Sequence, residues 1–148
     1  MKIKFNYKGV HHCEAVVLSC IDFRFWRESV EFIEKGLGIR SFDFPSVPGS
    51  AKAVNESYSI EETVKSCISV PMELHNAKKI VIINHEDCGA YGGSKEFGGD
   101  SAKEQSFHEE ELRTAKRNIL EHFPDKEVIL VYARFADDGE AVEFLTIE

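Results

Sequence analysis

A long apolar run and a block of basic residues are both missing from this 148-residue sequence. No stretch of 18 apolar residues occurs, which excludes a membrane-spanning helix. The formal net charge is -8 and no basic cluster is present, which argues against binding to nucleic acid or to an anionic membrane. The first residues, MKIKFNYKGVHH, lack the apolar segment of a secretory signal. We therefore expect a cytoplasmic protein that binds neither nucleic acid nor membranes.

The redox spacing C-x-x-C is absent, although the chain has four cysteines, enough for disulfides or a metal site. The four cysteines are expected to be free thiols, because a cytoplasmic protein rarely keeps disulfides. Without C-x-x-C, a redox role for Cys20 and Cys88 is disfavoured. Internal repeats, low-complexity segments and linkers are absent as well. The sequence therefore predicts that residues 1–148 form a single domain with a sizeable core.

Short apolar runs alternate with segments of helical periodicity along the chain. The apolar runs predict strands over 14–20, 39–44, 78–84 and 126–135. Spacing and capping residues predict helices over 24–38, from Ser59 to Pro71, which ends or kinks it, and over 101–123. We expect loops at 45–51 and in the glycine-rich segment 88–100, and an antiparallel strand over 140–148. This order predicts an α/β fold: a mainly parallel four-stranded sheet flanked by helices, with a C-terminal antiparallel edge strand.

Three metal-capable side chains directly follow predicted strands. Cys20 lies at the end of the first strand, and His85 and Cys88 follow the third with the spacing H-x-x-C. Sites in parallel sheets form at the carboxyl ends of strands, so neighbouring strands can bring these side chains to one point. Two thiolates and one imidazole suit Zn²⁺, and three protein ligands leave a fourth position open, as in catalytic zinc sites. Each residue alone is more often an ordinary core residue, and only the combination favours zinc.

The first of these cysteines belongs to the sequence CIDFR, which places Cys20, Asp22 and Arg24 in the pattern C-x-D-x-R. Asp22 is near enough to be a fourth ligand in a closed site, or to accept a hydrogen bond from a zinc-bound hydroxide. Arg24 can hold that carboxylate through a bidentate pair. Taken alone, the two residues also fit an acid at a helix N-terminus and a surface base.

C-x-D-x-R followed by H-x-x-C-G resembles the β-class carbonic anhydrases, and the resemblance extends over most of the chain. It implies that Cys20, His85 and Cys88 hold zinc and that Asp22 and Arg24 form a dyad that orients the zinc-bound hydroxide. It also implies a lyase that reversibly hydrates carbon dioxide to bicarbonate by attack of that hydroxide. A homodimer or higher homo-oligomer, with the site near the subunit interface, is implied as well.

The substrate CO₂ is apolar, so the pocket beside the metal should be apolar too. Candidate pocket residues are Phe23, Phe44, Val47 and Tyr91, together with Gly89, which permits a tight turn beside Cys88. The four larger side chains are more often plain core residues. Turnover also requires a proton to leave, and the sequence selects no single carrier among His11, His12, His75 and His108.

The segment 45–51, PSVPGSA, departs from the family pattern, because family members usually carry an arginine–asparagine–alanine–glycine loop there. Two alternatives therefore stay open. One is hydrolysis of carbon disulfide or carbonyl sulfide on the same scaffold. The other is a non-catalytic zinc-binding protein whose closed ligand shell includes Asp22. The sequence HHC at 11–13 can also bind a metal, but we interpret it as the lead-in to the first strand.

Overall fold

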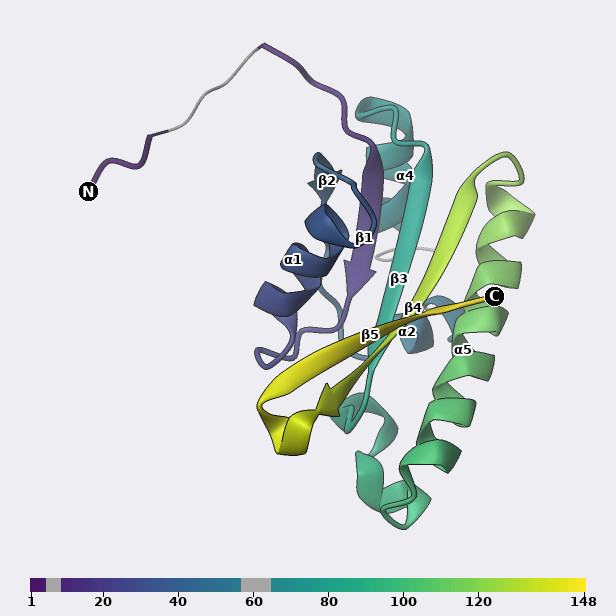
Figure 1. Ribbon diagram of the computed structural model, residues 1–148. Helices are drawn as coiled ribbons and strands as arrows, with labels where there is room; N and C mark the ends of the chain where they lie inside the picture. Colours follow the sequence, from purple (N-terminus) through teal and green to yellow (C-terminus); the bar gives the residue numbers. More distant parts are fainter. Residues whose placement is uncertain (5–8, 57–64) are drawn as a thin grey trace.

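The computed structural model describes residues 1–4, 9–56 and 65–148, which are built around one five-stranded sheet (Figure 1). The strands are β1 (Ala15–Ser19), β2 (Phe42–Asp43), β3 (Lys79–His85), β4 (Glu127–Ala136) and β5 (Ala141–Ile147). The helices are α1 (Trp26–Lys35), α2 (Ala51–Asn55), α4 (Lys65–Leu74) and α5 (Ser101–His122), with short 3-10 helices η2 (Gly89–Tyr91), η3 (Ser94–Phe97) and η4 (Asp137–Gly139). No helix within these ranges is both long and apolar enough to cross a membrane.

The sheet has the order β2-β1-β3-β4-β5, with four parallel strands and one antiparallel edge strand. Helices cover both faces of β1 and β3, which explains why AVVLS and KIVII are continuous apolar runs without polar alternation. After η4 the chain reverses, and β5 pairs antiparallel with β4. The predicted α/β class, with its mainly parallel sheet and antiparallel C-terminal strand, is confirmed.

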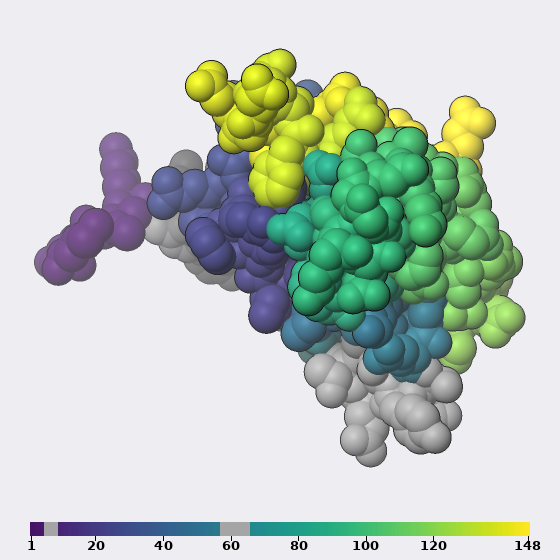
Figure 2. Space-filling model, turned by 90° about the horizontal axis from the view of Figure 1, so that it is seen from below, coloured from purple at the N-terminus to yellow at the C-terminus, as the bar shows by residue number. Residues whose placement is uncertain are grey.

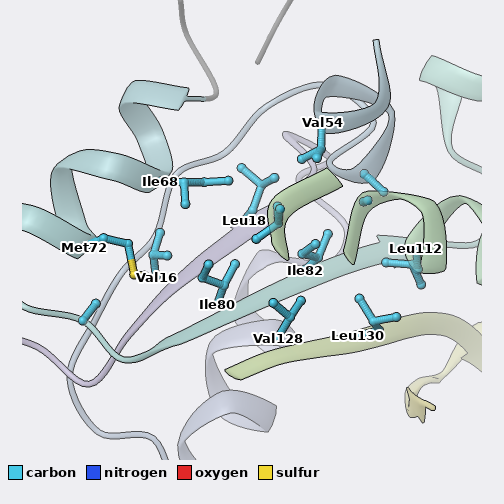
Figure 3. Packing of buried hydrophobic residues seen from close by; sticks show 14 of the residues in the cluster. Val16, Leu18, Val54, Ile68, Met72, Ile80, Ile82, Leu112, Val128 and Leu130 are labelled. Carbon is cyan, nitrogen blue, oxygen red and sulfur yellow. The ribbon is translucent and has the colours of Figure 1, made fainter. Parts of the chain in front are cut away.

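One face of the sheet packs against α2, α4 and α5 (Figure 3). Alternate residues of the central strands point to this face, because side chains along a strand alternate between its two sides. The cluster has its centre on Val16, Leu18, Ile80, Ile82 and Leu130, with helix contacts from Val54, Ile68, Met72 and Leu112. This layer holds the three helices against one face of the sheet.

The opposite face packs against α1 and residues of β5. The strand residues between those of the first cluster point here, and they are Ala15, Val17, Val81, Ile83, Val131 and Ala133. Phe25 and Ile33 close this layer from α1 and the turn before it. Because Phe25 is buried, the short segment between β1 and α1 is held against the sheet, and that segment carries Asp22 and Arg24.

Several stretches differ from the predicted elements. β2 has only two residues, because Pro45, two residues beyond it, has no N–H with which to continue the strand pairing. The short helix α2 was not predicted, since five residues carry too little periodicity to be recognised. Pro71 lies inside α4 and does not end it, because the helix continues to Leu74. The predicted helix start at Ser59 lies outside the described residues.

Candidate metal centre

The strand ends bring the three predicted ligands together at one edge of the sheet. Cys20 directly follows β1, and His85 is the last residue of β3, which pairs with β1 in parallel. Cys88 follows three residues after His85, just before η2. Figure 2 views the molecule from this end, where the segment after β1 adjoins the segment that contains η2 and η3. The parallel register therefore delivers side chains that are far apart in the sequence to one point.

The three side chains form a compact, buried cluster. The Sγ atoms of Cys20 and Cys88 are 3.9 Å apart, and the ligand atoms of Cys20, His85 and Cys88 all lie within 4.8 Å of one another. The residues are 8%, 2% and 2% exposed, respectively. A buried set of two thiols and one imidazole at this spacing has the chemistry of a divalent transition-metal site.

The imidazole of His85 is oriented for metal binding. Its Nδ1 lies 2.7 Å from the backbone oxygen of Glu86, so Nδ1 carries the proton and donates it to that carbonyl. Its Nε2 is then left with a free lone pair, and within the described part of the chain this buried atom has no hydrogen-bond partner. Phe25 stacks against the ring, with centroids 4.4 Å apart. Since a buried orphan acceptor is costly, the geometry fits an atom that binds a cation.

The electrostatics of the two thiols favour one shared negative charge in the metal-free cluster. The hydrogen bond from the thiol of Cys88 is the largest influence that lowers the pKa of Cys20, to about 4. The same hydrogen bond, together with burial, raises the pKa of Cys88. The backbone N–H of Gly49 also donates to the Cys20 sulfur at 3.4 Å. A thiolate is therefore available in this cluster before any metal binds, as metal ligation requires.

The loop that departs from the family pattern nevertheless holds Cys20 in place. The N–H of Val47 donates to the carbonyl of Ser19 at 2.9 Å, and the hydroxyl of Ser46 donates to the carbonyl of Cys20 at 3.1 Å. Gly49 adds its N–H to the sulfur itself. These contacts use backbone groups and one hydroxyl, so they do not require an arginine or an asparagine in the loop.

Asp22 and Arg24 form a paired, half-buried dyad beside the cluster. Arg24 donates from Nε to Asp22 Oδ1 at 2.9 Å and from Nη2 to Oδ2 at 2.6 Å, and its backbone N–H donates to Oδ1 at 3.0 Å. These hydrogen bonds hold the pKa of the Asp22 carboxyl below its usual value. Asp22 Oδ2 is also 4.0 Å from Nε2 of His85. The carboxylate therefore faces the ligand cluster while Arg24 holds it in the ionised form.

A further residue, which sequence reasoning did not assign to the site, fixes this arginine. Asp87 accepts from Arg24 Nη1 at 2.9 Å through its carboxylate and from Nη2 at 3.1 Å through its carbonyl. Its own N–H donates to Glu104, a buried carboxylate, at 2.7 Å, and Ser94 donates its N–H to Asp87 Oδ1 at 3.1 Å. The sequence offers one hint of this role, because Asp87 lies between His85 and Cys88 in the segment HEDC. That position does not reveal its partner, Arg24, which is 63 residues away.

Gly93 lies against the hydrogen-bond network of Asp87, so its replacement tests how closely the two are packed. Gly93 has φ 78° and ψ 176°, a conformation essentially restricted to glycine, and an added Cβ would lie 2.9 Å from Oδ1 of Asp87. We expect Gly93→Ala to lower the free energy of unfolding by about 1–3 kcal/mol in urea denaturation. Gly98→Ala is the control, because Gly98 also has positive φ but no described atom lies within 4 Å of its added Cβ. Equal losses in the two variants would show that the contact with Asp87 is unimportant.

The pairing of Asp87 with Arg24 should appear in the pH dependence of stability. The Arg24 guanidinium holds the pKa of Asp87 below its usual value, so the carboxylate contributes stability above its unfolded pKa of about 3.9 and loses it as the pH falls through the folded pKa. We expect Asp87→Asn to be less stable than wild type near neutral pH, with the difference shrinking below about pH 4. Urea denaturation of the chelator-treated protein measures this.

Asp138→Asn is the matched control for that comparison. Asp138 is exposed and has φ 55°, nearly the same left-handed backbone as Asp87 at φ 54°, so asparagine is equally tolerated at both positions. A pH-independent difference between Asp87→Asn and wild type would contradict the ion pair.

An open depression of about 640 Å³ lies against the cluster and the dyad. Cys20, Asp22 and Arg24 line it together with a mainly apolar wall made by Ile21, Phe23, Pro48, Gly89 and Ala90. Two predicted pocket residues, Phe23 and Gly89, are therefore on its wall, and Phe23 is 83% exposed.

The other three predicted pocket residues lie elsewhere. Phe44 packs against the core on the α1 face of the sheet, and Val47 packs against the core on the opposite face. The hydroxyl of Tyr91 donates to Glu111 at 3.2 Å, and its ring packs edge-on against Phe107. These three residues were predicted as walls because an apolar substrate favours apolar side chains, but the strand and loop geometry turns them toward α5 or the sheet.

The fold and the cluster together define a class: an α/β protein with a Cys-His-Cys group able to hold a metal at the carboxyl ends of two parallel strands. A family model described as "Putative carbonic anhydrase" matches residues 10–143, and the chain belongs to this family, as the sequence motifs predicted.

Two relatives are uncharacterized proteins. One, from Rickettsia bellii, is 35% identical over 84% of this chain and 79% of its own length. The other, from Rickettsia conorii, is 34% identical over 83% and 68%.

Solved structures of carbonic anhydrases share the fold. The carbonic anhydrase from Glaciozyma antarctica aligns with a TM-score of 0.58 at 16% identity, covering 94% of this chain and 84% of that one. β-Carbonic anhydrase isoform I from Trichomonas vaginalis gives 0.56 at 15% identity, covering 97% and 87%. The carbonic anhydrase from Streptococcus mutans gives 0.53 at 17% identity, covering 98% and 87%. At these identities the likeness concerns the fold.

Proposed function

We propose that this protein is a zinc-dependent carbonic anhydrase, which reversibly converts CO₂ and water to bicarbonate and a proton. The observation that carries the proposal is the unpartnered Nε2 of His85, buried beside two thiols and faced by an aspartate paired with arginine. Membership of the carbonic anhydrase family and the shared fold support it. Thiol ligands require reducing conditions, so the cytoplasm is the proposed location.

Cys20, His85 and Cys88 are the residues that would hold the zinc ion. When bound by two thiolates and one imidazole, Zn²⁺ makes water a usable nucleophile near neutral pH. The carbonyl of Glu86 keeps His85 in the tautomer whose Nε2 can bind the metal. The N–H of Gly49 stabilises the charge on Cys20.

Asp22 is proposed to orient the attacking water. Its carboxylate faces the ligand cluster and can accept the hydrogen bond of that water, which turns a lone pair of the oxygen toward the substrate carbon. Arg24 keeps the carboxylate ionised and fixes its position through four hydrogen bonds. Because those contacts engage both oxygens of Asp22, they favour an open ligand shell over a closed one in which Asp22 binds the metal.

The apolar wall suits an apolar substrate. Ile21, Phe23, Pro48 and Ala90 present carbon atoms next to the cluster, so CO₂ can approach without displacing strongly bound water. No carrier for the departing proton is evident among the four histidines considered from the sequence. His108 is fully buried and burial lowers its pKa to about 4, and the others lie outside the pocket wall. Release to solvent through the open depression is therefore the simplest route.

We also propose that a second copy of the chain packs against the exposed apolar part of this wall and leaves the depression open to solvent. Phe23 is 83% exposed and Ile21 is 61% exposed on its wall, and large apolar side chains exposed together are typical of an interface. Phe23→Ser should shift the mass measured by light scattering from dimer toward monomer. Leu74→Ser, at an exposed apolar residue at the end of α4, should leave the mass unchanged. A dimer that persists in Phe23→Ser would place the interface elsewhere.

Stopped-flow CO₂ hydration by the zinc-loaded protein, followed from neutral to alkaline pH, tests the proposed activity. We expect rapid hydration that rises with pH, because deprotonated water is the nucleophile. Hydration no faster than in buffer alone, with one zinc bound at Cys20, His85 and Cys88, would contradict the proposal.

Carbonyl sulfide hydrolysis is the second candidate, and one observation favours testing it. Pro48, in the loop that departs from the family pattern, lies on the pocket wall, while the adjacent Gly49 contacts the Cys20 sulfur. A changed wall can change which linear, apolar molecule fits. Rates with CO₂ and with carbonyl sulfide, measured on the same zinc-loaded sample, separate the two candidates.

A further inference from the structure

We propose that the protein carries a second zinc site, made by Cys13, Asp43 and His75 with His11 as the fourth ligand. These residues come from three separate segments: the lead-in to β1, the end of β2 and the residue after α4. The ligand atoms of Cys13, Asp43 and His75 all lie within 4.8 Å of one another. The inference does not depend on the proposed carbonic anhydrase activity.

The distances in this cluster approach those of a tetrahedral zinc site. Zn–S and Zn–O bonds of about 2.3 and 2.1 Å give a sulfur–oxygen edge of about 3.6 Å, and Cys13 Sγ lies 3.5 Å from Asp43 Oδ2. His75 Nδ1 forms a hydrogen bond of 2.5 Å with the same oxygen. To bind one zinc ion together, these two atoms must move apart to about 3.4 Å, the nitrogen–oxygen distance between two ligands of a tetrahedral site. The side chains of His75 and Asp43 are 26% and 34% exposed, so both can make this small rotation, and an ion can reach them from solvent.

His11, the proposed fourth ligand, lies outside the group of three but contacts one of its members. The ring of His11 meets that of His75 edge-on, with centroids 4.8 Å apart. One thiolate, one carboxylate and two imidazoles neutralise a divalent cation and match the ligand preferences of Zn²⁺. An ordinary Asp43–His75 hydrogen bond explains two of these side chains, but it does not explain why the Cys13 thiol also lies 3.5 Å from Asp43 Oδ2.

The backbone holds this arrangement in place. The N–H of Cys13 donates to the carbonyl of His75 at 2.9 Å, which ties the lead-in of β1 to the end of α4. Asp43 pairs with Val16 in the parallel register of β1 and β2. With four protein ligands and no open position, the site is of the structural kind, and it would fasten the chain before β1 to the sheet edge.

The second cluster is distinct from the first. Cys13 precedes β1 and Cys20 follows it, so the two clusters lie at opposite ends of this strand (Figure 1). Seven residues of extended chain separate the two cysteines by about 23 Å. No ligand can therefore be shared, and loss of one site leaves the geometry of the other intact.

Titration of the reduced, metal-free full-length protein with Co²⁺, followed by zinc displacement and elemental analysis, tests the proposal. We expect two equivalents of metal in the wild-type protein, each with thiolate-to-cobalt absorption. Cys13→Ser should bind one equivalent. Cys67→Ser is the matched control and should bind two, because Cys67 lies on α4 outside both clusters. His75→Gln repeats the test without changing a cysteine, and circular dichroism verifies that each variant is folded.

Each outcome decides the proposal. One equivalent in the wild-type protein overturns it if folded Cys13→Ser keeps that equivalent, and so do two equivalents in both folded variants, Cys13→Ser and His75→Gln. If Cys13→Ser does not fold, the His75→Gln result decides alone. Because metal stoichiometry is the readout, failure of CO₂ hydration leaves the result unaffected, and an active enzyme with a single zinc would still overturn the second site.

Discussion

Replacing Cys20 with alanine is expected to remove one equivalent of bound zinc and to abolish CO₂ hydration. Structural zinc sites with four ligands bind with about 10–16 kcal/mol, so one ligand is worth about 3–4 kcal/mol, or two to three powers of ten in affinity. Cys20 also supplies the thiolate that Gly49 and the thiol of Cys88 stabilise. Chelator competition measures the affinity, and stopped-flow hydration measures the activity.

The matched control for this prediction is Cys67→Ala, which removes a partly buried thiol from α4 at a distance from the cluster. It should keep both the zinc and the activity. Retention of zinc with wild-type affinity in Cys20→Ala would show that Cys20 is not a ligand. Loss of activity with zinc retained would instead give the thiol a role other than metal binding.

The second large effect is expected from Asp22→Asn, which should lower hydration by about 10²–10⁴-fold while the zinc stays bound. Asparagine has the same shape as aspartate but offers one neutral oxygen and an amide in place of two charged oxygens. It therefore loses the charge-assisted pair with Arg24 and can no longer orient water through a fixed carboxylate. Zinc content and kcat, measured on one preparation, separate a defect in the dyad from loss of metal.

Asp125→Asn, in the exposed turn after α5, is the matched control and should behave as wild type. Full hydration by Asp22→Asn would remove Asp22 from the mechanism. A loss of zinc in this variant would have a different meaning, since it would assign Asp22 to the ligand shell of a closed site.

The convergence of Cys20, His85 and Cys88 and the pairing of Asp22 with Arg24 could be predicted because each residue lies beside a strong local pattern. The apolar runs AVVLS and KIVIINH locate the ends of β1 and β3, and parallel pairing brings those ends together. The sequence therefore predicts that Cys20 and His85 lie near each other. The pattern C-x-D-x-R likewise puts Asp22 and Arg24 within reach of each other, two residues apart.

The contacts that could not be predicted depend on how loops turn. Asp87 contacts Arg24 because it adopts φ 54°, a left-handed conformation that the sequence does not specify for an aspartate. Tyr91 faces Glu111 on α5 because a 3-10 turn follows Cys88. Neither the left-handed conformation of Asp87 nor the turn after Cys88 is indicated by a periodic pattern of apolar residues. The cluster of Cys13, Asp43 and His75 was missed for the same reason, since its members are spread over three segments without a common spacing.

The separation of the ligands along the chain governs when the metal centre can form during synthesis. Cys20 and Cys88 are 68 residues apart, and only the pairing of β1 with β3 brings them within 3.9 Å. On the ribosome, β1 and the dyad are made first, and they cannot capture zinc until β3 has emerged and docked. Zinc acquisition at this site would therefore follow the pairing of β1 with β3, before β4 and β5 are made. A bound ion would hold together two strands whose association otherwise carries the entropic cost of closing a long loop.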